Sequence, residues 1–320
     1  MSSVYNGLLN VYKEPGYTSN DVVAKLRGIL HQRKIGHTGT LDPDAVGVLV
    51  VCLGNGTRLC DMLTEHTKEY IAVCRLGVTT DTQDMSGTVL QEQQVNVTTE
   101  QLHAAVMAFV GDYDQIPPMY SAIKIGGRKL YDLAREGKEI ERQPRRIHID
   151  AIAVLDTSLL QSEHIFTMEV KCSKGTYIRT LCHDIGQRLG CGAAMQHLTR
   201  TAVGSFHLED AITLGQIEQL RDAGMLQDRI QSSEQLFRDL DAVRIDDAWR
   251  VQIENGNSFK PEQILSESPE QEQDITDPDK MYADGERVRV YGQDGTFFGI
   301  YRFNAKTLSF QVEKFFFERS

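Results

Sequence analysis

An apolar run of eight residues, VGVLVVCL at 46–53, constrains the fold more than any other part of the sequence. The run lacks the polar alternation of a half-exposed strand, so it predicts a strand covered on both faces. The residues before it, GHTGTLDPDA at 36–45, are mostly small or polar and include two glycines, which favours a shaped loop. One carboxylate, Asp42, therefore stands at the edge of a buried segment.

The composition is that of a folded protein, with 320 residues of which 41% are hydrophobic and 25% charged. This length suffices for one large domain, or for a large and a small one. No apolar run approaches the ~18 residues of a membrane-spanning helix, and the N-terminus lacks the basic start and apolar core of a signal peptide. We therefore expect a cytoplasmic protein.

The cysteines indicate neither a metal site nor a disulfide framework. None of the six forms a CxxC pair, and most lie in apolar segments, as small core residues do. We expect a reduced protein without a structural metal. The six are Cys52, Cys60, Cys74, Cys172, Cys182 and Cys191.

A formal net charge of −11 argues against a nucleic-acid partner, because phosphate binding depends on Lys and Arg. The charge is unevenly distributed along the chain. Residues 124–146 hold eight basic and four acidic side chains, whereas residues 260–280 hold seven acidic side chains and two lysines. The chain is therefore locally polarised, which the net charge does not show.

Periodicity predicts alternating helices and strands up to about residue 240. Capping residues and helical spacing indicate helices over 19–30, 98–110 and 177–189, and another that begins after Thr213. Strands are expected at 46–53, 70–76, 147–155 and 163–172, with a polar loop at 77–88. Beyond residue 240, GERVRVYGQDGTFFGIYRF predicts two strands around a turn, with a further strand pair after Asn304.

Asp42 alone supports several interpretations. The Asp-Pro pair that it begins is most often a plain turn. A carboxylate held at a pocket edge can also act as a nucleophile, a general base or an ion-pair partner. A nucleophile in a partly dry pocket needs a nearby cation to stay ionised, and the residues themselves do not show which cation.

Five separated stretches resemble, in order, the motifs of the tRNA pseudouridine-55 synthases of the TruB type. Agreement of five motifs in order is far more specific than any single motif. The C-terminal part resembles, more weakly, the small RNA-binding domain that ends many bacterial members. The resemblance as a whole covers residues 4 to about 210. The five stretches read GLLNVYKEPGYTSNDVV, GHTGTLDPDAVGVLVV, KEYIAVCRLGVTTDTQDMSG, QIPPMYSAIKIGGRKLYDLAREG and CSKGTYIRTLCHDIG.

The resemblance implies three catalytic residues. Asp42 matches the catalytic aspartate of the family, and Arg179 matches the arginine that forms an ion pair with it. Tyr70 matches the tyrosine that stacks on the target uracil and is a candidate general base. Each has an ordinary structural alternative, since Tyr70 also fits a half-buried strand residue and Arg179 a solvated helix residue.

Further residues are implied to bind the substrate. His37 matches the histidine that occupies the space left by the flipped base, and Tyr177 and Leu198 match residues that pack around the site. Asp84 matches a loop aspartate that supports the polar network. A thumb-like loop at about 115–146, which closes on RNA in the family, supplies the basic set Lys124, Arg128, Lys129 and Arg135.

The implied fold is α+β, with a mixed, mainly antiparallel central sheet flanked by helices and an inserted thumb loop. The implied domains are a catalytic domain at 1–238 and a β-rich, PUA-like RNA-binding domain at 239–320 with an acidic insert at 260–280. The implied reaction converts uridine 55 of the tRNA T-loop to pseudouridine by base flipping, without cofactor or metal. The implied partner is tRNA, gripped at its T-loop and elbow by a monomer that needs no membrane.

Two other functions stay open at this stage. A tRNA-folding chaperone would grip the elbow with or without catalysis, because flipping a base already opens the loop. A glycosidase acting on free nucleosides would want a second carboxylate near the first, and the sequence shows no evident pair. Departures from the family pattern are the displaced proline in Lys13-Glu14-Pro15-Gly16, Asn20 in place of a common histidine, and the acidic insert.

Overall fold

A ten-stranded sheet runs through most of the molecule in the computed structural model, which describes residues 5–265 and 280–317. The main path is β14-β1-β3-β12-β4-β11-β10-β7, with β2 added to β3 and β13 to β12. Its pairings are antiparallel except that between β3 and β12. The strands are β1 (Gly7–Lys13), β2 (Ile35–His37), β3 (Val46–Leu53), β4 (Lys68–Leu76), β7 (Gly111–Gln115), β10 (Arg145–Asp156), β11 (Ile165–Cys172), β12 (Ala193–Val203), β13 (Phe206–His207) and β14 (Ile230–Gln231).

Strand β3 is buried along its whole length, as its apolar sequence predicts. It pairs with β1 on one edge and with β12 on the other, and its two faces contribute to separate apolar clusters. Leu49 and Val51 face one cluster, and Val48 and Val50 face the other. The loop that precedes β3 is therefore anchored at its C-terminal end by a strand that is enclosed on every side.

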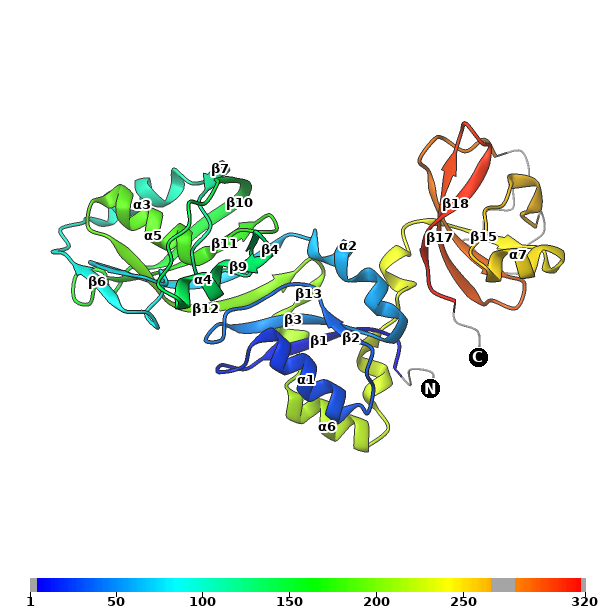
Figure 1. The fold of residues 1–320 in the computed structure, drawn as a ribbon, viewed down its shortest axis with the longest axis horizontal. Coiled ribbons are helices and arrows are strands. Elements are labelled where there is room, and N and C mark those ends of the chain that lie inside the picture. The colour runs from blue at the N-terminus through cyan, green and yellow to red at the C-terminus, as the bar shows by residue number, and fades with distance from the viewer. Residues whose placement is uncertain (1–4, 266–279, 318–320) are drawn as a thin grey trace.

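Helices cover the sheet in two pairs (Figure 1). Helices α1 and α6 lie together against the β1–β3 part, where Val22, Leu26 and Ile217 are buried with Leu49. Helices α3 and α5 lie together against the part that contains β4, β11 and β10. The helices are α1 (Ser19–Ile29), α2 (Cys60–Thr64), α3 (Thr99–Met107), α4 (Leu130–Arg135), α5 (Ile178–Leu189), α6 (Leu214–Asp222) and α7 (Arg250–Glu254).

Local sequence signals explain where several helices begin and end. Thr18, Thr98 and Thr213 each form a capping box with the residue three positions on, so α1, α3 and α6 begin where the sequence predicts. Gly190 ends α5 in the left-handed conformation, at a φ of 75°. The short 3₁₀ helices are η1 (Gly54–Leu59), η2 (Leu208–Asp210), η3 (Leu226–Arg229), η4 (Gln235–Phe237), η5 (Asp247–Trp249) and η6 (Pro261–Gln263).

Several predictions from periodicity were wrong. The expected polar loop at 77–88 contains β5 (Val78–Thr80), which pairs with β6 (Val89–Glu92) as a two-stranded ribbon. Strand β12 was not predicted at all, although it joins the two halves of the sheet. The helix expected to extend to residue 110 ends at Met107. In the described part of the chain a single strand follows Asn304, not a pair.

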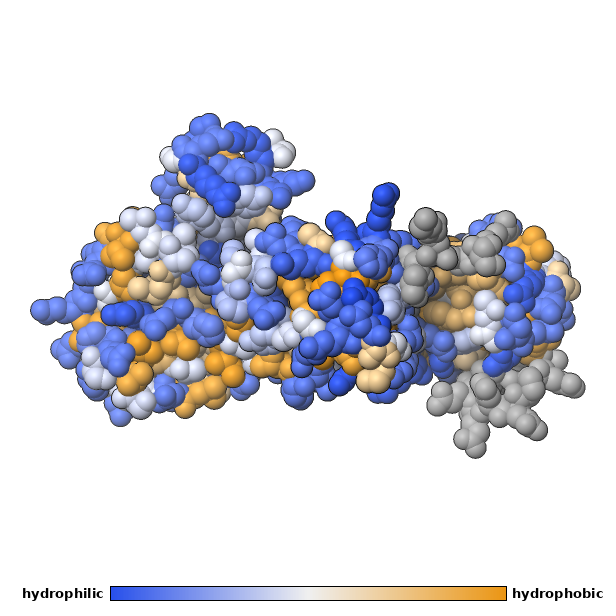
Figure 2. Space-filling view, turned by 90° about the horizontal axis from the view of Figure 1, so that it is seen from below, coloured by the Kyte–Doolittle hydropathy of each residue, from blue (hydrophilic) through white to orange (hydrophobic). Residues whose placement is uncertain are grey.

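The segment expected to form a thumb contains a hairpin and a short helix. Strands β8 (Lys124–Ile125) and β9 (Arg128–Lys129) pair across Gly126 and Gly127, whose φ angles of 58° and 83° suit glycine. Helix α4 follows at once, with Leu130 and Leu133 buried. Figure 2 shows a largely hydrophilic projection that stands out from the body near the horizontal position of α4 and β9 in Figure 1.

A second sheet of four strands forms near the C-terminus, in the order β15-β16-β17-β18 (Figure 1). Its strands are β15 (Asp241–Ile245), β16 (Arg287–Gly292), β17 (Phe297–Asn304) and β18 (Ser309–Phe315). Phe316 is buried against the main body, and its carbonyl accepts a hydrogen bond from Asn55 Nδ2 at 3.2 Å. Most of the acidic insert, residues 266–279, lies outside the described residues.

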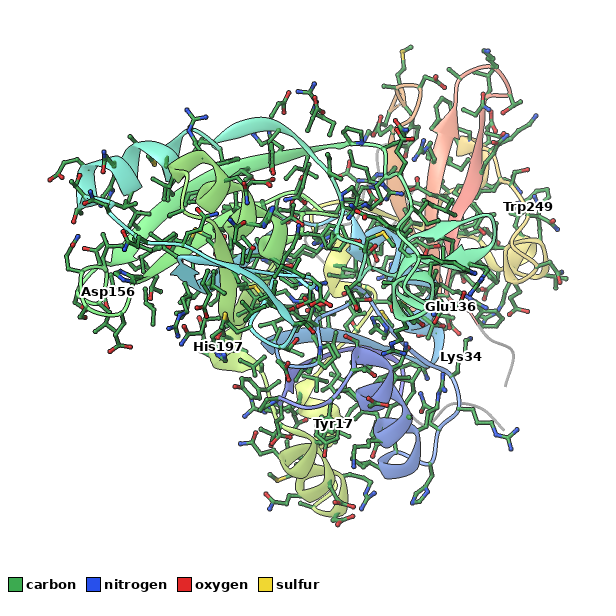
Figure 3. All side chains as sticks on the ribbon, turned by 60° about the vertical axis from the view of Figure 1, so that its left-hand side comes forward. Tyr17, Lys34, Glu136, Asp156, His197 and Trp249 are labelled. Atoms are coloured by element: carbon green, nitrogen blue, oxygen red, sulfur yellow. The ribbon has the colours of Figure 1, made fainter. Side chains whose placement is uncertain are left out.

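These observations confirm the expected fold class, a mixed and mainly antiparallel sheet flanked by helices with a small β-rich part at the C-terminus. Figure 3 shows Trp249 at the edge of that C-terminal part and Asp156, the last residue of β10, at the opposite side of the view. No helix within residues 5–265 and 280–317 is long and apolar enough to cross a membrane.

Candidate active site

The loop that carries Asp42 is held by a buried lysine. The Lys13 side chain is fully buried, and its ammonium donates to the carbonyls of Pro43 and Ala45, at 2.8 and 2.5 Å. The Ala45 amide also donates to the carbonyl of Asp42 at 3.1 Å. These bonds fix the backbone on both sides of Asp42, while its side chain stays 33% exposed and open to a ligand.

Arg179 grips the Asp42 carboxylate with two nitrogens. Its Nε lies 2.8 Å from Oδ2, and its Nη2 donates to Oδ1 at 3.0 Å, which is the two-pronged geometry that suits a guanidinium and a carboxylate. The remaining donors bind the carbonyls of Thr82 and Tyr120, each at 3.0 Å, and Asp84 Oδ2 at 3.4 Å. The arginine side chain is only 6% exposed, so its orientation is fixed.

The electrostatic setting of Asp42 combines opposed effects. Burial raises the pKa of the Asp42 carboxyl, the charge of Arg179 opposes that rise, and the neighbouring carboxylate of Asp84 adds to it. A carboxylate with a raised pKa is a stronger base than a solvated one, and the guanidinium still favours its ionised form. This combination suits a nucleophile or a general base.

An apolar group flanks the ion pair. Tyr70, on β4, is 8% exposed and belongs to the same buried cluster as Leu41, Ala45 and Leu198. Burial raises the pKa of the Tyr70 hydroxyl, so the phenol is neutral at pH 7. The charged pair thus borders a buried apolar wall that contains an aromatic ring.

Of the other residues singled out in the sequence, Asp84 contacts Arg179 directly, whereas His37 forms no hydrogen bond or ion pair with Asp42 or Arg179 in the described part of the chain. His37 is on β2; burial lowers its pKa, and its Nδ1 has no hydrogen-bond partner among the described residues. Tyr177 precedes α5, where its amide donates to Gln115 Oε1 at 2.8 Å. Asp84 accepts from the hydroxyl of Thr82 at 2.7 Å. The structure thus links Asp84 directly to Arg179 and places Tyr177 two residues before it.

The thumb residues are pre-arranged to different extents. Lys129 and Arg135 both lie over the ring of Tyr131, at 5.1 and 5.4 Å from its centre. Arg128 forms an ion pair with Glu136, whereas the exposed Lys124 has no ion-pair partner among the described residues. Glu136, labelled in Figure 3, would therefore compete with an RNA phosphate for Arg128.

Sequence reasoning missed two buried cations next to the site, Lys13 and Arg200. Lys13 stands in the first motif, but nothing in that motif indicates that its side chain is buried. Arg200 is 2% exposed and donates to the carbonyl of Val48 at 2.7 Å. The sequence also gave no sign of the Tyr120 carbonyl, because backbone acceptors leave no trace in side-chain patterns.

Metal ligands do not cluster in the described part of the chain, where no group of three or more His, Cys, Asp or Glu side chains could hold an ion. All six cysteines are free thiols. Burial raises the pKa of Cys172 to about 11, so this thiol is protonated and unreactive at neutral pH.

Solved structures with a similar fold define the class. The chain aligns with Cbf5 in a complex with Nop10 and Gar1 at 26% identity and a TM-score of 0.68, over 98% of this chain and 85% of that one. It aligns equally well with a chain of an H/ACA ribonucleoprotein bound to a substrate RNA containing 2′-deoxyuridine, at 25% identity and a TM-score of 0.67, over 98% of this chain and 86% of that one. The fold is that of a pseudouridine synthase.

Sequence comparison gives the family. The model of the TruB family pseudouridylate synthase N-terminal domain matches residues 27–178, and that of the tRNA pseudouridylate synthase B C-terminal domain matches residues 179–238. A tRNA pseudouridine synthase B of Lachnoclostridium phytofermentans is 46% identical over 97% of this chain and 99% of its own length. One of Bacillus pumilus is 40% identical over 92% of both. The chain belongs to the TruB family of pseudouridylate synthases, which confirms the resemblance and the enzyme class predicted from the sequence.

Proposed function

We propose that this chain converts uridine 55 in the T-loop of tRNA to pseudouridine. Its family and the names of its relatives support the reaction class and tRNA as the substrate. The observation that carries the proposal is the pairing of Asp42 with Arg179 at the edge of the apolar group around Tyr70. A flipped base could stack there, with its ribose toward the carboxylate.

The reaction breaks the bond between N1 of uracil and C1′ of ribose, joins C5 to C1′, releases the proton of C5 and leaves a proton on N1. Asp42 acts on the nucleotide by attacking C1′, adding to the base or removing a ribose proton. Tyr70 would hold the detached base by stacking, and either Tyr70 or Asp42 would take the C5 proton. Arg179 would keep the carboxylate ionised and oriented throughout.

The remaining proposed roles concern binding. His37, Tyr177 and Leu198 would pack around the flipped nucleotide, and Asp84 would support Arg179 through their contact. The thumb would close on the T-loop and elbow, with its basic side chains on phosphates. We also propose that residues 1–238 form the catalytic domain and residues 239–320 a PUA-like domain that contacts RNA.

The cellular setting is proposed on separate grounds. Six free thiols suit a reducing compartment, so we propose that the chain acts in the cytoplasm. We propose that it works there as a monomer on one tRNA. Light scattering of the protein alone and with tRNA tests this, since a mass twice that of the chain would contradict it.

Tritium release tests the reaction. A tRNA transcript labelled with tritium at C5 of uridine is incubated with the wild type, with Asp42→Asn, and with Asp44→Asn. Asp44 is an exposed carboxylate of the same loop, so its variant controls for lost charge. We expect release from the T-loop uridine with the wild type and Asp44→Asn, and none with Asp42→Asn.

Each other outcome has a definite meaning. Release by Asp42→Asn would show that another group does the chemistry. No release by a folded wild type that binds tRNA would leave the chaperone function as the better account. Release from free uridine at a similar rate would contradict recognition of the folded T-loop.

A further inference from the structure

Within the part of the chain that the structure describes, Arg200 has the largest fully buried side chain, and ordinary packing does not explain it. It is 2% exposed, and no carboxylate within residues 5–265 and 280–317 forms an ion pair with it. Removing a guanidinium from water without a counter-ion is strongly unfavourable. An apolar residue of similar volume at this position would therefore give a larger free energy of unfolding. The presence of Arg200 at this position therefore indicates a role other than packing in the core.

The guanidinium binds three backbone carbonyls, two of them just before Asp42 in the sequence and one in β3. Its Nε donates to Val48 O at 2.7 Å, its Nη2 to Gly39 O at 3.4 Å and its Nη1 to Thr40 O at 3.5 Å. Val48 lies in β3, whereas the other two lie in the loop just before the carboxylate. Arg200 therefore ties the start of the Asp42 loop to the strand that follows it.

The same residue also lies beside the tyrosine. In the ladder between β12 and β4, Arg200 pairs with Tyr70, and in the parallel ladder between β12 and β3 it pairs with Gly47. Gly47 has a φ of 105°, and a Cβ there would lie 2.2 Å from the Arg200 carbonyl, so β3 and β12 approach closely at this point. One arginine thus adjoins both the strand of the phenol and the loop of the carboxylate.

We propose that Arg200 is a positioning residue for the isomerisation, which sets the Asp42 loop and the Tyr70 hydroxyl in register with each other. The inference rests on the proposed function. It assigns Arg200 no contact with the substrate. It predicts that losing the guanidinium slows the chemical step while tRNA binding is retained.

The charge of Arg200 also acts on the tyrosine. Arg200 from β12, Cys172 from β11 and Asp42 from its loop act electrostatically on the Tyr70 hydroxyl. Burial raises the pKa of Tyr70, the charge of Arg200 lowers it, and the other two raise it. Removing the arginine charge should therefore raise the pKa of Tyr70 further and make proton transfer through it harder at neutral pH.

Two variants and one control separate positioning from stability. Arg200→Lys keeps the charge but loses the planar fork, and Arg200→Met keeps the volume but loses the charge. Lys68→Met is the control, because Lys68 is also a buried cation on backbone carbonyls, those of Thr64 and His66 at 2.6 and 2.7 Å. Folding is checked by circular dichroism and tRNA affinity by filter binding.

We expect both Arg200 variants to lower the single-turnover rate of tritium release at least about 30-fold, with tRNA affinity within about threefold of wild type. Arg200→Met should also shift the alkaline part of the pH–rate profile to higher pH, and Arg200→Lys should shift it less. Lys68→Met should change the rate less than about threefold. In the Tyr70→Phe background the loss from Arg200→Met should shrink, because the two residues would act together.

Three results would overturn the inference. The rate could stay unchanged in a folded variant, the control could lose as much as the Arg200 variants, or both Arg200 variants could fail to fold, which would make the arginine purely structural. The wild-type assay distinguishes failure of the proposed function from failure of the inference about Arg200. A wild type that releases no tritium refutes the proposed function, whereas an active wild type with normal Arg200 variants refutes only this inference.

Discussion

Arg179 and Tyr120 are joined by a hydrogen bond in which Nη2 of the arginine donates to the tyrosine carbonyl at 3.0 Å. The same nitrogen donates to Asp42 Oδ1, also at 3.0 Å. Tyr120 lies a few residues before the β8–β9 hairpin, at the base of the thumb. A movement of the thumb base would therefore displace the Arg179 nitrogen that orients the Asp42 carboxylate.

Arg179→Lys should lower the single-turnover rate of tritium release about 100-fold, equivalent to about 2.7 kcal/mol. Lysine keeps the positive charge but cannot bind both carboxylate oxygens and two carbonyls at once. Arg142→Lys is the matched control, since Arg142 also donates to a carbonyl of the thumb base, that of Pro117 at 3.2 Å, but does not touch Asp42. An equal loss in the two variants would contradict a specific role for the Asp42 contact.

Asp84→Asn should shift the acid part of the pH dependence of kcat/KM to lower pH. Asp84 raises the pKa of Asp42, so removing its charge lowers the pH at which Asp42 becomes protonated. Arg179 and Lys13, the other charged groups around Asp42, stay in place. The profile is measured from pH 4 to 8 at saturating and subsaturating tRNA. An acid limb that moves to higher pH would show that the Arg179 contact of Asp84 matters more than its charge.

Asp184→Asn should stabilise the protein at pH 7 by about 1–3 kcal/mol. Burial raises the pKa of Asp184 to about 6 from its ordinary value of 3.8, so above pH 6 the folded state carries a disfavoured charge. That penalty disappears as the pH falls from about 6 toward 4, because the folded state then binds the proton first. Urea unfolding at pH 7 and pH 4.5 measures the difference.

The exposed Asp228→Asn provides the control for that measurement. Its free energy of unfolding should match that of the wild type at both pH values. Asp184→Asn should lose most of its advantage at pH 4.5, and an advantage that stays constant with pH would point to a cause other than the buried charge.

Charged residues of the thumb should affect the salt dependence of tRNA binding. Lys124→Ala should reduce the slope of log K against log salt by about 0.7–0.9, as expected for one lost phosphate contact. Glu136→Gln should tighten binding at low salt, because Arg128 and Lys138 hold the Glu136 carboxylate and would be freed. Filter binding between 50 and 300 mM salt checks both. Unchanged binding by Glu136→Gln would mean that the freed cations do not reach RNA.

The sequence predicts best what depends on near neighbours in the chain. The capping boxes at Thr18, Thr98 and Thr213, the enclosed strand β3 and the end of α5 at Gly190 all rest on local patterns. Strand β12 escaped prediction because AAMQHLTRTAV mixes small and polar residues without a clear period of two. Its partners on both edges decide its conformation.

The residues of the candidate site likewise divide into those that sequence motifs identify and those that they do not. Asp42, Tyr70 and Arg179 stand in motifs, so their residue types could be found in the sequence. Arg200 stands in no motif, and Lys13 stands in one that does not show its burial, because charged residues are normally exposed and the partners of both are carbonyls of distant residues. The pattern of side chains in a sequence does not indicate which backbone carbonyls will require a side-chain hydrogen-bond donor in the folded protein.

The parallel ladder between β3 and β12 has a consequence for the order of folding. It pairs Val46 with Thr199 and Gly47 with Arg200, so it must close a loop of about 150 residues, which is slow compared with forming local hairpins. Asp42 stands on one side of this junction and Tyr70 on the other. During refolding, turnover should therefore return only after most secondary structure is in place, so the recovery of activity reports when this ladder has closed.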